Sequence, residues 1–323
     1  MILAGDVGGT KTLIGLFEPD ARRPVAVDVR TFPTTQFPGL PAIISAFLEQ
    51  QPTRPTITTA AFGVAGPVIN QSAKMTNVAW AVDAAEIGRQ FNLTQVHLLN
   101  DLEAMAHSVP VLAASELKSL QGGGQTLLAG NVALIAAGTG LGEALLHYSN
   151  GSFLVIPSEG GHSDFAPRTD REFAFAHFLR DQFGRAEIEH VLSGPGLLNL
   201  SNFTHIDSAC AAMAHGIPDT PAAVGASALA GTCPKCVEAM DLLVAAYGAA
   251  AGNLALTAVT RGGVFVGGGV APKILPALEN GKFIQAFNDK GPMRPLLESI
   301  PVNVILNPQA ALLGAAVSAN RAL

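Results

Sequence analysis

Gly5-Asp6-Val7-Gly8-Gly9-Thr10-Lys11-Thr12 is the segment on which the fold assignment rests. Apolar residues run on either side of it, at 2–5 and 11–17, and they predict two strands joined by a glycine-rich turn at residues 6–10. Glycines expose successive backbone N–H groups and, because they lack a Cβ atom, let phosphate oxygens approach them. The segment therefore predicts a hairpin that binds phosphate.

A second segment repeats this arrangement. Residues 132–148 predict a strand, a glycine turn at 137–142, and a second strand. The hydroxyl groups of Thr10 and Thr139 add hydrogen-bond donors to the two turns. A carboxylate in such a turn repels phosphate unless a cation lies between them, so we expect Asp6 to hold Mg²⁺ through water. The two turns together predict a protein that clamps a nucleotide phosphate.

Two common phosphate-binding motifs are excluded. The P-loop pattern requires glycine where Thr10 stands and a helix after the loop, whereas residues 13–17 predict a strand. In Gly138-Thr139-Gly140-Leu141-Gly142 the third glycine comes one residue too early for a dinucleotide fingerprint. The hairpins therefore belong to another nucleotide-binding class.

Composition restricts the class of protein further. The chain has 323 residues, 49% hydrophobic and 14% charged, which favours a compact α/β enzyme with two lobes. The net charge of −6 and the lack of a basic run argue against nucleic acid and membrane partners. Residues 242–259 carry no formal charge, yet their alanine and glycine content predicts a buried helix rather than a membrane span.

The start of the chain and its cysteines indicate the compartment. Residues 1–6 enter an apolar strand directly, without the basic flank and cleavage site of a secretion signal. Three cysteines are an odd number, which favours a reducing environment over a disulfide framework. We therefore expect a cytoplasmic protein.

Polar residues that could act on a sugar follow the predicted strands. Phosphoryl transfer to a hydroxyl group needs an acceptor for its proton, and Asp101, beside Asn100 at the end of strand 96–99, is the leading candidate. The alternative is that Asp101 is only a helix N-cap. Glu159 and His162, on a Gly-Gly turn, could form hydrogen bonds with sugar hydroxyls.

The two glycine turns, with Gly267-Gly268-Gly269 after the strand at 263–266, resemble those of the sugar kinase, Hsp70 and actin superfamily. The resemblance implies a two-lobed, actin-like ATPase (ribonuclease H-like) α/β fold with a nucleotide and sugar cleft between the lobes. We expect a small domain at 1–110 plus 307–323 and a large domain at 111–306. The residues implied to bind ATP are Gly5, Asp6, Val7, Gly8, Gly9, Thr10, Gly138, Thr139, Gly140, Gly268 and Gly269.

Bacterial glucokinases are the group that the chain resembles most. The matching segments, in the family's order, are 5–10, 98–101, 137–142, 157–162, 189–196 and 263–269. The resemblance implies ATP-dependent phosphorylation of the 6-hydroxyl of D-glucose with Mg²⁺, Asp101 as the base, and a homodimer. The residues implied to bind glucose are Asn100, Asp101, Glu159, His162 and Glu189. Asn77 and Trp80 lie in a segment that also resembles the family's, and their roles stay open.

Two other functions remain open. The chain could phosphorylate another hexose or an amino sugar such as N-acetylmannosamine. It could also be an ATP-dependent switch, which would not need Asp101, Glu159 and His162 together. A regulator acting on DNA should carry a helix-turn-helix before the first loop, and that loop begins at residue 5.

Lys11 stands where glucokinases often carry asparagine, and Gly-Gly-Thr-Lys also resembles the repressor-kinase (ROK) sugar kinases, which usually carry a cysteine-rich zinc motif. Cys233 and Cys236 form a single CxxC, Cys210 is distant in sequence, and no histidine adjoins them. The sequence therefore predicts structural or incidental cysteines and no four-ligand zinc site.

Overall fold

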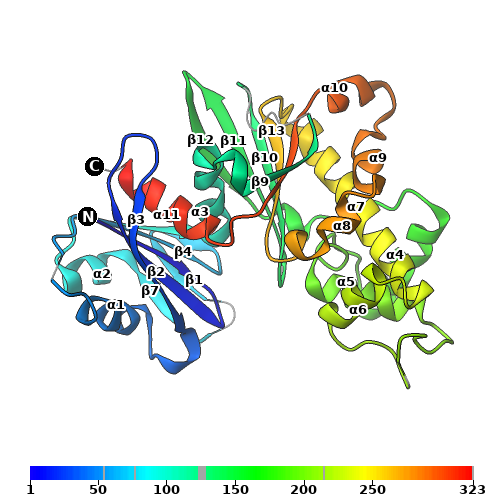
Figure 1. Ribbon diagram of the computed structural model, residues 1–323, viewed down its shortest axis with the longest axis horizontal. Helices are drawn as coiled ribbons and strands as arrows, with labels where there is room; N and C mark the ends of the chain where they lie inside the picture. Colours follow the sequence, from blue (N-terminus) through cyan, green and yellow to red (C-terminus); the bar gives the residue numbers. More distant parts are fainter. Residues whose placement is uncertain (54, 76–77, 123–128, 214, 322–323) are drawn as a thin grey trace. The chain divides into compact units, whose positions relative to one another are not determined.

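The computed structural model describes residues 1–53, 55–75, 78–122, 129–213 and 215–321 (Figure 1). The chain divides into two compact units. Unit 1 is Met1–Ala113 with Asn307–Leu323, and unit 2 is Ala114–Leu306. Each unit contains its own β-sheet and its own helices, so each is described separately.

The main sheet of unit 1 has five strands in the order β3-β2-β1-β4-β8. Their bounds are β1 (Ile2–Val7), β2 (Lys11–Glu18), β3 (Val25–Pro33), β4 (Thr59–Val64) and β8 (Gln95–Asn100). Strands β1, β4 and β8 are parallel, whereas β1–β2 and β2–β3 are antiparallel hairpins. A small sheet adds β5 (Val68–Ile69), β6 (Ser72–Lys74) and β7 (Ala81–Asp83).

The first glycine turn is shorter than the sequence predicts. Asp6 pairs with Leu13 and Val7 with Thr12, so β1 continues two residues past Gly5. The expected turn at 6–10 is corrected to residues 8–10, because backbone pairing with β2 continues through the aspartate.

Helices cover both faces of this sheet. Helices α1 (Leu40–Glu49) and α2 (Ala84–Phe91) share one apolar cluster with the sheet. Helices α3 (Asp101–Ser108) and α11 (Ala310–Asn320) share another, on the opposite face. A Cβ atom at Gly314 of α11 would overlap the backbone oxygen of Ala104 in α3. The two helices therefore pack with their backbones in close approach, and the last helix of the chain belongs to the first unit.

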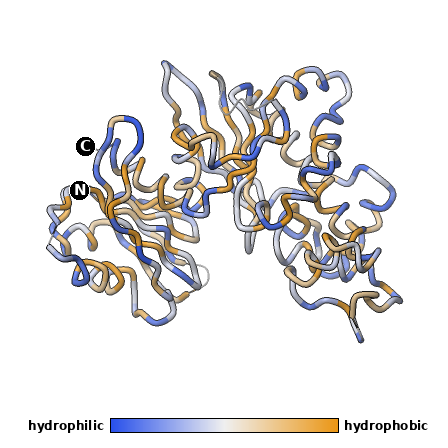
Figure 2. Tube along the Cα trace, in the orientation of Figure 1, coloured by the Kyte–Doolittle hydropathy of each residue, from blue (hydrophilic) through white to orange (hydrophobic). Residues whose placement is uncertain are grey.

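The sheet of unit 2 has six strands in the order β12-β11-β10-β13-β14-β9. Their bounds are β9 (Leu117–Gln121), β10 (Val132–Ala137), β11 (Leu141–Ser149), β12 (Ser152–Ser158), β13 (Gly263–Gly267) and β14 (Val302–Ile305). Strands β10 and β11 form a hairpin and β13 lies parallel to β10, as β1, β2 and β4 do in unit 1. The predicted repeat of one arrangement is confirmed. Strands β4, β10 and β13 are buried along their whole length, and apolar residues recur along them in Figure 2.

The helices of unit 2 pack around a central one. They are α4 (Asp170–Phe183), α5 (Gly194–Thr204), α6 (Pro221–Leu229), α7 (Pro234–Ala258), α8 (Leu275–Leu278), α9 (Lys282–Asn288) and α10 (Arg294–Glu298). Helix α7 is long and apolar enough to cross a membrane, but 72% of its most apolar window is buried inside the unit. The prediction of a buried helix at 242–259 is confirmed, although the helix begins earlier and ends at Ala258.

The structure brings the three cysteines and a histidine together, which the sequence did not indicate. His205 follows α5 directly and lies in space beside Cys210, Cys233 and Cys236. The sequence concealed this cluster, because the end of α5 and the start of α7 are distant along the chain but pack together in the fold.

Candidate functional site

Hydrogen bonds of two buried threonines, Thr12 and Thr34, stabilise the first glycine turn. The N–H of Gly8 donates to the backbone oxygen of Lys11 at 3.1 Å. The hydroxyl of Thr34 donates to the backbone oxygen of Gly8 at 2.8 Å and lies 2.8 Å from the hydroxyl of Thr12. Thr34 belongs to no motif that the sequence displays, so sequence reasoning missed it.

The residues expected around phosphate in this hairpin fall into two groups. Gly5 and Val7 are buried within β1, and a Cβ atom at Gly5 would lie 2.5 Å from the Phe62 ring. Gly5 is therefore required for packing inside the sheet. Gly8 and Gly9 are half-buried and Thr10 is exposed, so the turn itself is the part that a ligand can reach.

Asp6 lies near the end of β1 and Asp101 directly follows β8, and a glycine of β4 lies between these two strands. Asp6 pairs with Gly63 of β4, and Gly63 with Leu99 of β8. A Cβ atom at Gly63 would lie 2.8 Å from the Cβ of Ala104 and 3.5 Å from the Cα of Asp101. Gly63, which sequence reasoning also missed, therefore lets the start of α3 approach the aspartate of β1.

The two carboxylates influence each other. The pKa of Asp6 is raised to about 6. Burial is the main cause, the negative charge of Asp101 adds to the rise, and the charge of Lys11 opposes it. Neighbouring carboxylates that disfavour each other's ionisation are stabilised by a cation, and carboxylate oxygens are ligands that Mg²⁺ accepts. The donor set at Asp6 therefore fits the expected metal.

Asn100, not Asp101, caps α3. The Asn100 side-chain oxygen accepts from the N–H of Leu102 at 2.9 Å, and its amide donates to the backbone oxygen of Gly66 at 3.2 Å. Glu103 completes a capping box with the backbone N–H of Asn100. The side chain of Asp101, the first residue of the helix, is exposed, and one of its oxygens also accepts from Leu102. The alternative in which Asp101 is the N-cap is wrong, because its neighbour occupies that position.

In unit 2, Glu189 is attached to the second glycine turn. Its Oε2 accepts from the N–H of Leu141 at 2.8 Å, and a Cβ atom at Gly140 would lie 2.5 Å from that oxygen. The N–H of Gly138 donates to the oxygen of Gly140, and the oxygen of Gly138 accepts from Gly194 at the start of α5, both at 2.8 Å. Glu189 was expected to bind glucose; in the structure one of its oxygens holds the second glycine turn, and its glucose contact stays a prediction.

Glu159 and His162 lie near Glu189 at the end of β12. His162 Nδ1 is 2.9 Å from Glu187 Oε2. This hydrogen bond is the main reason that the pKa of His162 is raised; burial opposes the rise, and the charges of Glu189, Glu187 and Glu159 add to it. Arg185 lies 3.4 Å from Glu187 and donates to the backbone oxygen of His162 at 2.9 Å. Glu187, only two residues before Glu189, was missed by sequence reasoning.

The late glycines adjoin the second turn. Gly268 has φ of +82°, and a Cβ atom there would overlap the backbone oxygen of Ala137. The hydroxyl of the buried Tyr247 accepts from the N–H of Ala137 at 3.1 Å and lies 3.4 Å from the backbone oxygen of Gly267. Gly269 is exposed beside them. Gly268 thus lies against Ala137, the residue before the second turn, and Tyr247 of α7 joins the ends of β10 and β13.

Two further expectations concern unit 1. Trp80 is 9% exposed and belongs to the apolar cluster beneath α1 and α2, so the structure gives it a packing role. Asn77 lies outside the described residues.

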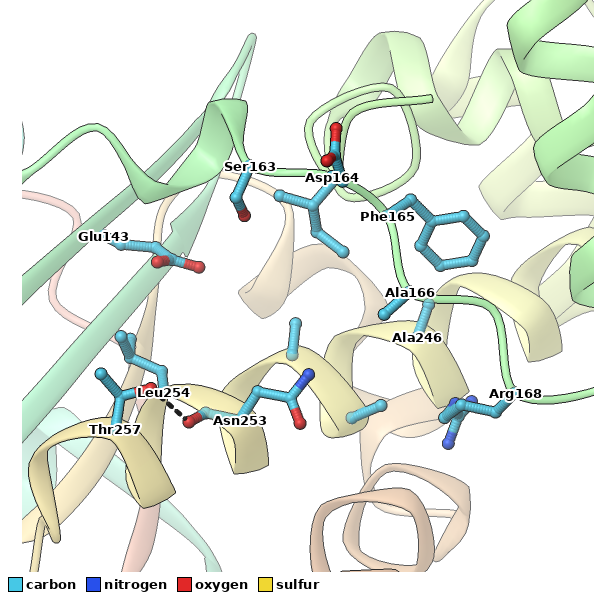
Figure 3. Close-up of a pocket in the computed structure, with 13 residues that line it drawn as sticks. Glu143, Ser163, Asp164, Phe165, Ala166, Arg168, Ala246, Asn253, Leu254 and Thr257 are labelled. Atoms are coloured by element: carbon cyan, nitrogen blue, oxygen red, sulfur yellow. Dashed lines mark hydrogen bonds between the residues drawn. The ribbon is translucent and has the colours of Figure 1, made fainter. Parts of the chain in front are cut away.

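A pocket lies behind the loop that follows His162 (Figure 3). Its volume is about 160 Å³, with Ser163 and Asp164 on one rim and Asn253 and Thr257 of α7 on the other. Glu143 also lines it, and burial raises the pKa of that carboxyl. Among the described residues, none of those expected to bind ATP or glucose lines this pocket, which is therefore distinct from the predicted site.

Comparisons with known proteins agree with one another. A family model described as Glucokinase matches residues 3–322. The chain is 38% identical to the glucokinase of Trichormus variabilis over 342 residues, covering 99% of both chains. It superposes on the crystal structure of a glucokinase from an Antarctic psychrotroph with a TM-score of 0.86 and 30% identity, covering 99% and 98% of the two chains. A ROK family glucokinase from Streptomyces griseus, in complex with glucose and AMPPNP, has a TM-score of 0.63 and 21% identity over 99% of both chains. These similarities confirm the two-lobed α/β fold of actin-like sugar kinases.

Proposed function

The chain belongs to the glucokinase family, and on that premise we propose that it transfers the γ-phosphoryl group of ATP to the 6-hydroxyl of D-glucose, with Asp101 as the general base. The observation that carries this proposal is the pair of aspartates at the ends of β1 and β8, beside the first glycine turn. Asp6 is half-buried in a strand and Asp101 is exposed at a helix start, so the two carboxylates suit different tasks.

The proposed reaction consists of one proton transfer, one bond that forms and one bond that breaks. The Asp101 carboxylate accepts the proton of the 6-hydroxyl while the oxygen of that hydroxyl forms a bond to the γ-phosphorus. The bond between that phosphorus and the β–γ bridging oxygen breaks, and ADP leaves with the electron pair. A base placed in line with the transferred group raises the rate by about 10²–10⁴.

Asp6 would hold Mg²⁺ through water. The metal would supply positive charge to the phosphate oxygens when bound. The chain's own contribution is the N–H groups of residues 8–10 and 138–140, which can donate to phosphate, with the hydroxyls of Thr10 and Thr139. We propose that both turns bind the same nucleotide, and that Gly268 and Gly269 lie near its adenosine.

The sugar would be held by polar side chains of both units. Glu159 and His162 are exposed on their loop, where they can meet sugar hydroxyls. Asn100 uses its amide to cap α3 and Glu189 uses one oxygen to hold the second turn, so each would orient the sugar with its remaining hydrogen-bonding capacity. We further propose that the enzyme acts in the cytoplasm and forms a homodimer, as the resemblance to the family suggests.

A coupled ADP-release assay tests the proposal. The substrates are glucose, mannose, fructose, galactose and N-acetylated hexosamines, and we expect the highest kcat/KM with glucose. A higher value with N-acetylmannosamine or another hexose would overturn the sugar assignment but not the kinase assignment. ATP hydrolysis that did not depend on any sugar would favour a switch and contradict the proposed transfer.

A further inference from the structure

Unit 2 contains four buried metal-ligand side chains that the phosphoryl transfer does not use. They are His205, Cys210, Cys233 and Cys236, and one donor atom from each lies within 4.8 Å of all the others. Their exposed fractions are 4%, 2%, 1% and 0%, in the same order. All three cysteines are free thiols. Three sulfurs and one imidazole thus converge in a space closed to solvent.

The distances fit one tetrahedral ion. Zinc lies about 2.3 Å from cysteine sulfur and about 2.0–2.1 Å from histidine nitrogen, so tetrahedral ligands are about 3.8 Å apart for two sulfurs and about 3.6 Å for sulfur and nitrogen. The Cys210 and Cys236 sulfurs are 3.8 Å apart. His205 Nε2 lies 3.4 Å from the Cys233 sulfur and 4.0 Å from the Cys236 sulfur.

The imidazole is oriented as a metal ligand requires. His205 Nδ1 donates its proton to the backbone oxygen of Ser201 at 2.8 Å. With the proton on Nδ1, the lone pair of Nε2 faces the sulfurs. A backbone carbonyl that fixes the second nitrogen is the usual partner of a metal-binding histidine.

Two of the three cysteines lie at the start of a helix. Cys233 is the N-cap of α7 and Cys236 lies in its first turn, where the helix dipole favours a thiolate. Several sulfurs in one buried space repel one another once ionised, and a cation removes that repulsion.

We propose that His205, Cys210, Cys233 and Cys236 bind one zinc ion. Three soft sulfurs and one imidazole in a tetrahedron favour zinc among the common divalent ions. Four protein ligands leave no open position, so the ion would be structural. It would fasten the irregular segment after α5, which carries Cys210, to the first turn of α7 (Figure 1).

Metal analysis of the full chain tests the proposal. The protein is produced in zinc-containing medium without a histidine tag, purified under reducing conditions and analysed by inductively coupled plasma mass spectrometry. We expect about one zinc ion per chain, retained on dialysis against EDTA. Cys236→Ser should weaken zinc affinity at least about tenfold. His177→Gln, which changes an exposed histidine of α4 outside the cluster, should leave zinc content unchanged.

A second measurement needs no variant, because a cysteine substitution could prevent folding. The unmodified chain is stripped of metal under denaturing conditions and refolded with Co²⁺. We expect sulfur-to-cobalt charge-transfer bands and the intense d–d bands of tetrahedral cobalt, which added Zn²⁺ abolishes. A folded, reduced chain without metal that takes up no cobalt would overturn the proposal. So would a Cys210–Cys236 disulfide found by mass spectrometry in freshly isolated protein, or zinc retained equally by Cys236→Ser.

Discussion

At the scale of single residues, Asp6 and Asp101 are neighbours in different surroundings. Asp6 is half-buried in a strand and has a pKa raised to about 6 by burial, then by Asp101, against the opposing charge of Lys11. Asp101 is exposed at the first position of a helix capped by Asn100. Environment rather than residue type thus separates a group suited to a cation from one suited to a proton.

Replacing Asp101 with asparagine removes the proposed proton acceptor but keeps the shape of the side chain. We expect Asp101→Asn to lower kcat by about 10²–10⁴ and to change the dissociation constant for glucose little. Single-turnover kinetics and calorimetric glucose titration separate the two effects. Glu49→Gln, at the exposed end of α1, is the control and should retain full activity. Turnover near the unmodified level in Asp101→Asn would rule out this residue as the base.

Replacing Asp6 with asparagine tests its raised pKa. A carboxyl whose pKa is higher in the folded state than in the unfolded state destabilises the fold once ionised. Its cost therefore appears as the pH rises from 3.8 toward about 6 and is complete above that. Asp6→Asn should remove a cost of up to about 3 kcal/mol at neutral pH, raise Tm, and increase the Mg²⁺ concentration needed for half-maximal activity. Thermal unfolding at pH 4 and pH 7 checks this, and an equal change in Tm at both values would contradict it.

The hydrogen bond between His162 and Glu187 should be visible in a titration. Glu187→Gln removes the main cause of the raised His162 pKa, so that pKa should fall toward its usual value. The bond stabilises the fold below the usual imidazole pKa and loses this effect as pH rises through the raised value. NMR titration of the imidazole protons measures the change. Glu279→Gln, which affects a separate ion pair with Lys118, is the control and should leave the His162 titration unmoved.

At the scale of elements, helix packing depends on glycines that no ligand touches. Gly314 lets the backbone of α11 approach α3. Gly225 of α6 has ordinary space, because a Cβ atom there would lie 3.9 Å from the nearest described atom, the terminal carbon of Met240. The two helical glycines therefore differ in their surroundings and should respond oppositely to the same substitution.

We expect Gly314→Ala to destabilise the protein by about 1–3 kcal/mol, because the methyl group would overlap the oxygen of Ala104. Gly225→Ala should stabilise it by about 0.5–1 kcal/mol, since alanine loses less backbone entropy in a helix. Denaturant midpoints of the two variants, measured beside the unmodified chain, check both signs. A Gly314→Ala midpoint equal to or above that of the unmodified chain would show that the helices can separate at no cost.

The sequence predicted the elements whose signals are local. Both glycine hairpins and the buried α7 are each predicted from one continuous segment, and the structure confirms them. The family is predicted from several short motifs, and the comparisons confirm it. The roles assigned to Asp101, Glu159 and His162 remain predictions. Thr34, Gly63 and Tyr247 could not be predicted, because each acts through a partner distant in the chain. The cysteine cluster was missed for the same reason: its side chains come from the segment after α5 and from the start of α7, which are distant along the chain.

At the scale of the whole molecule, the chain forms most of unit 1, then all of unit 2, and returns to unit 1 with α11. Ile2, Ala4 and Ala61 of the first unit share an apolar cluster with Leu312 and Ala316 of α11. Without α11, the part of this cluster that α3 does not cover would lose its apolar partners, and burial of apolar surface is the main favourable contribution to folding.

Truncation after Leu306 removes α11 and leaves unit 2 whole. We expect the truncated chain to lose cooperative unfolding of unit 1 and to aggregate, while the amides of β10 and β13 remain protected from hydrogen exchange. Hydrogen exchange with mass spectrometry on both chains reads the two units separately. Full protection of β1 and β4 in the truncated chain would show that α11 is dispensable for the first sheet.

The position of α11 also sets the order in which the protein can mature on the ribosome. Strand β1 is translated about 300 residues before the helix that covers it. Unit 2 has all of its strands by Ile305, before α11 is synthesised. Residues 1–113 therefore have one apolar face only partly covered until α11 is made, and during this period chaperones can bind such a surface. Unit 1, whose main sheet is translated before unit 2, is thus completed after it.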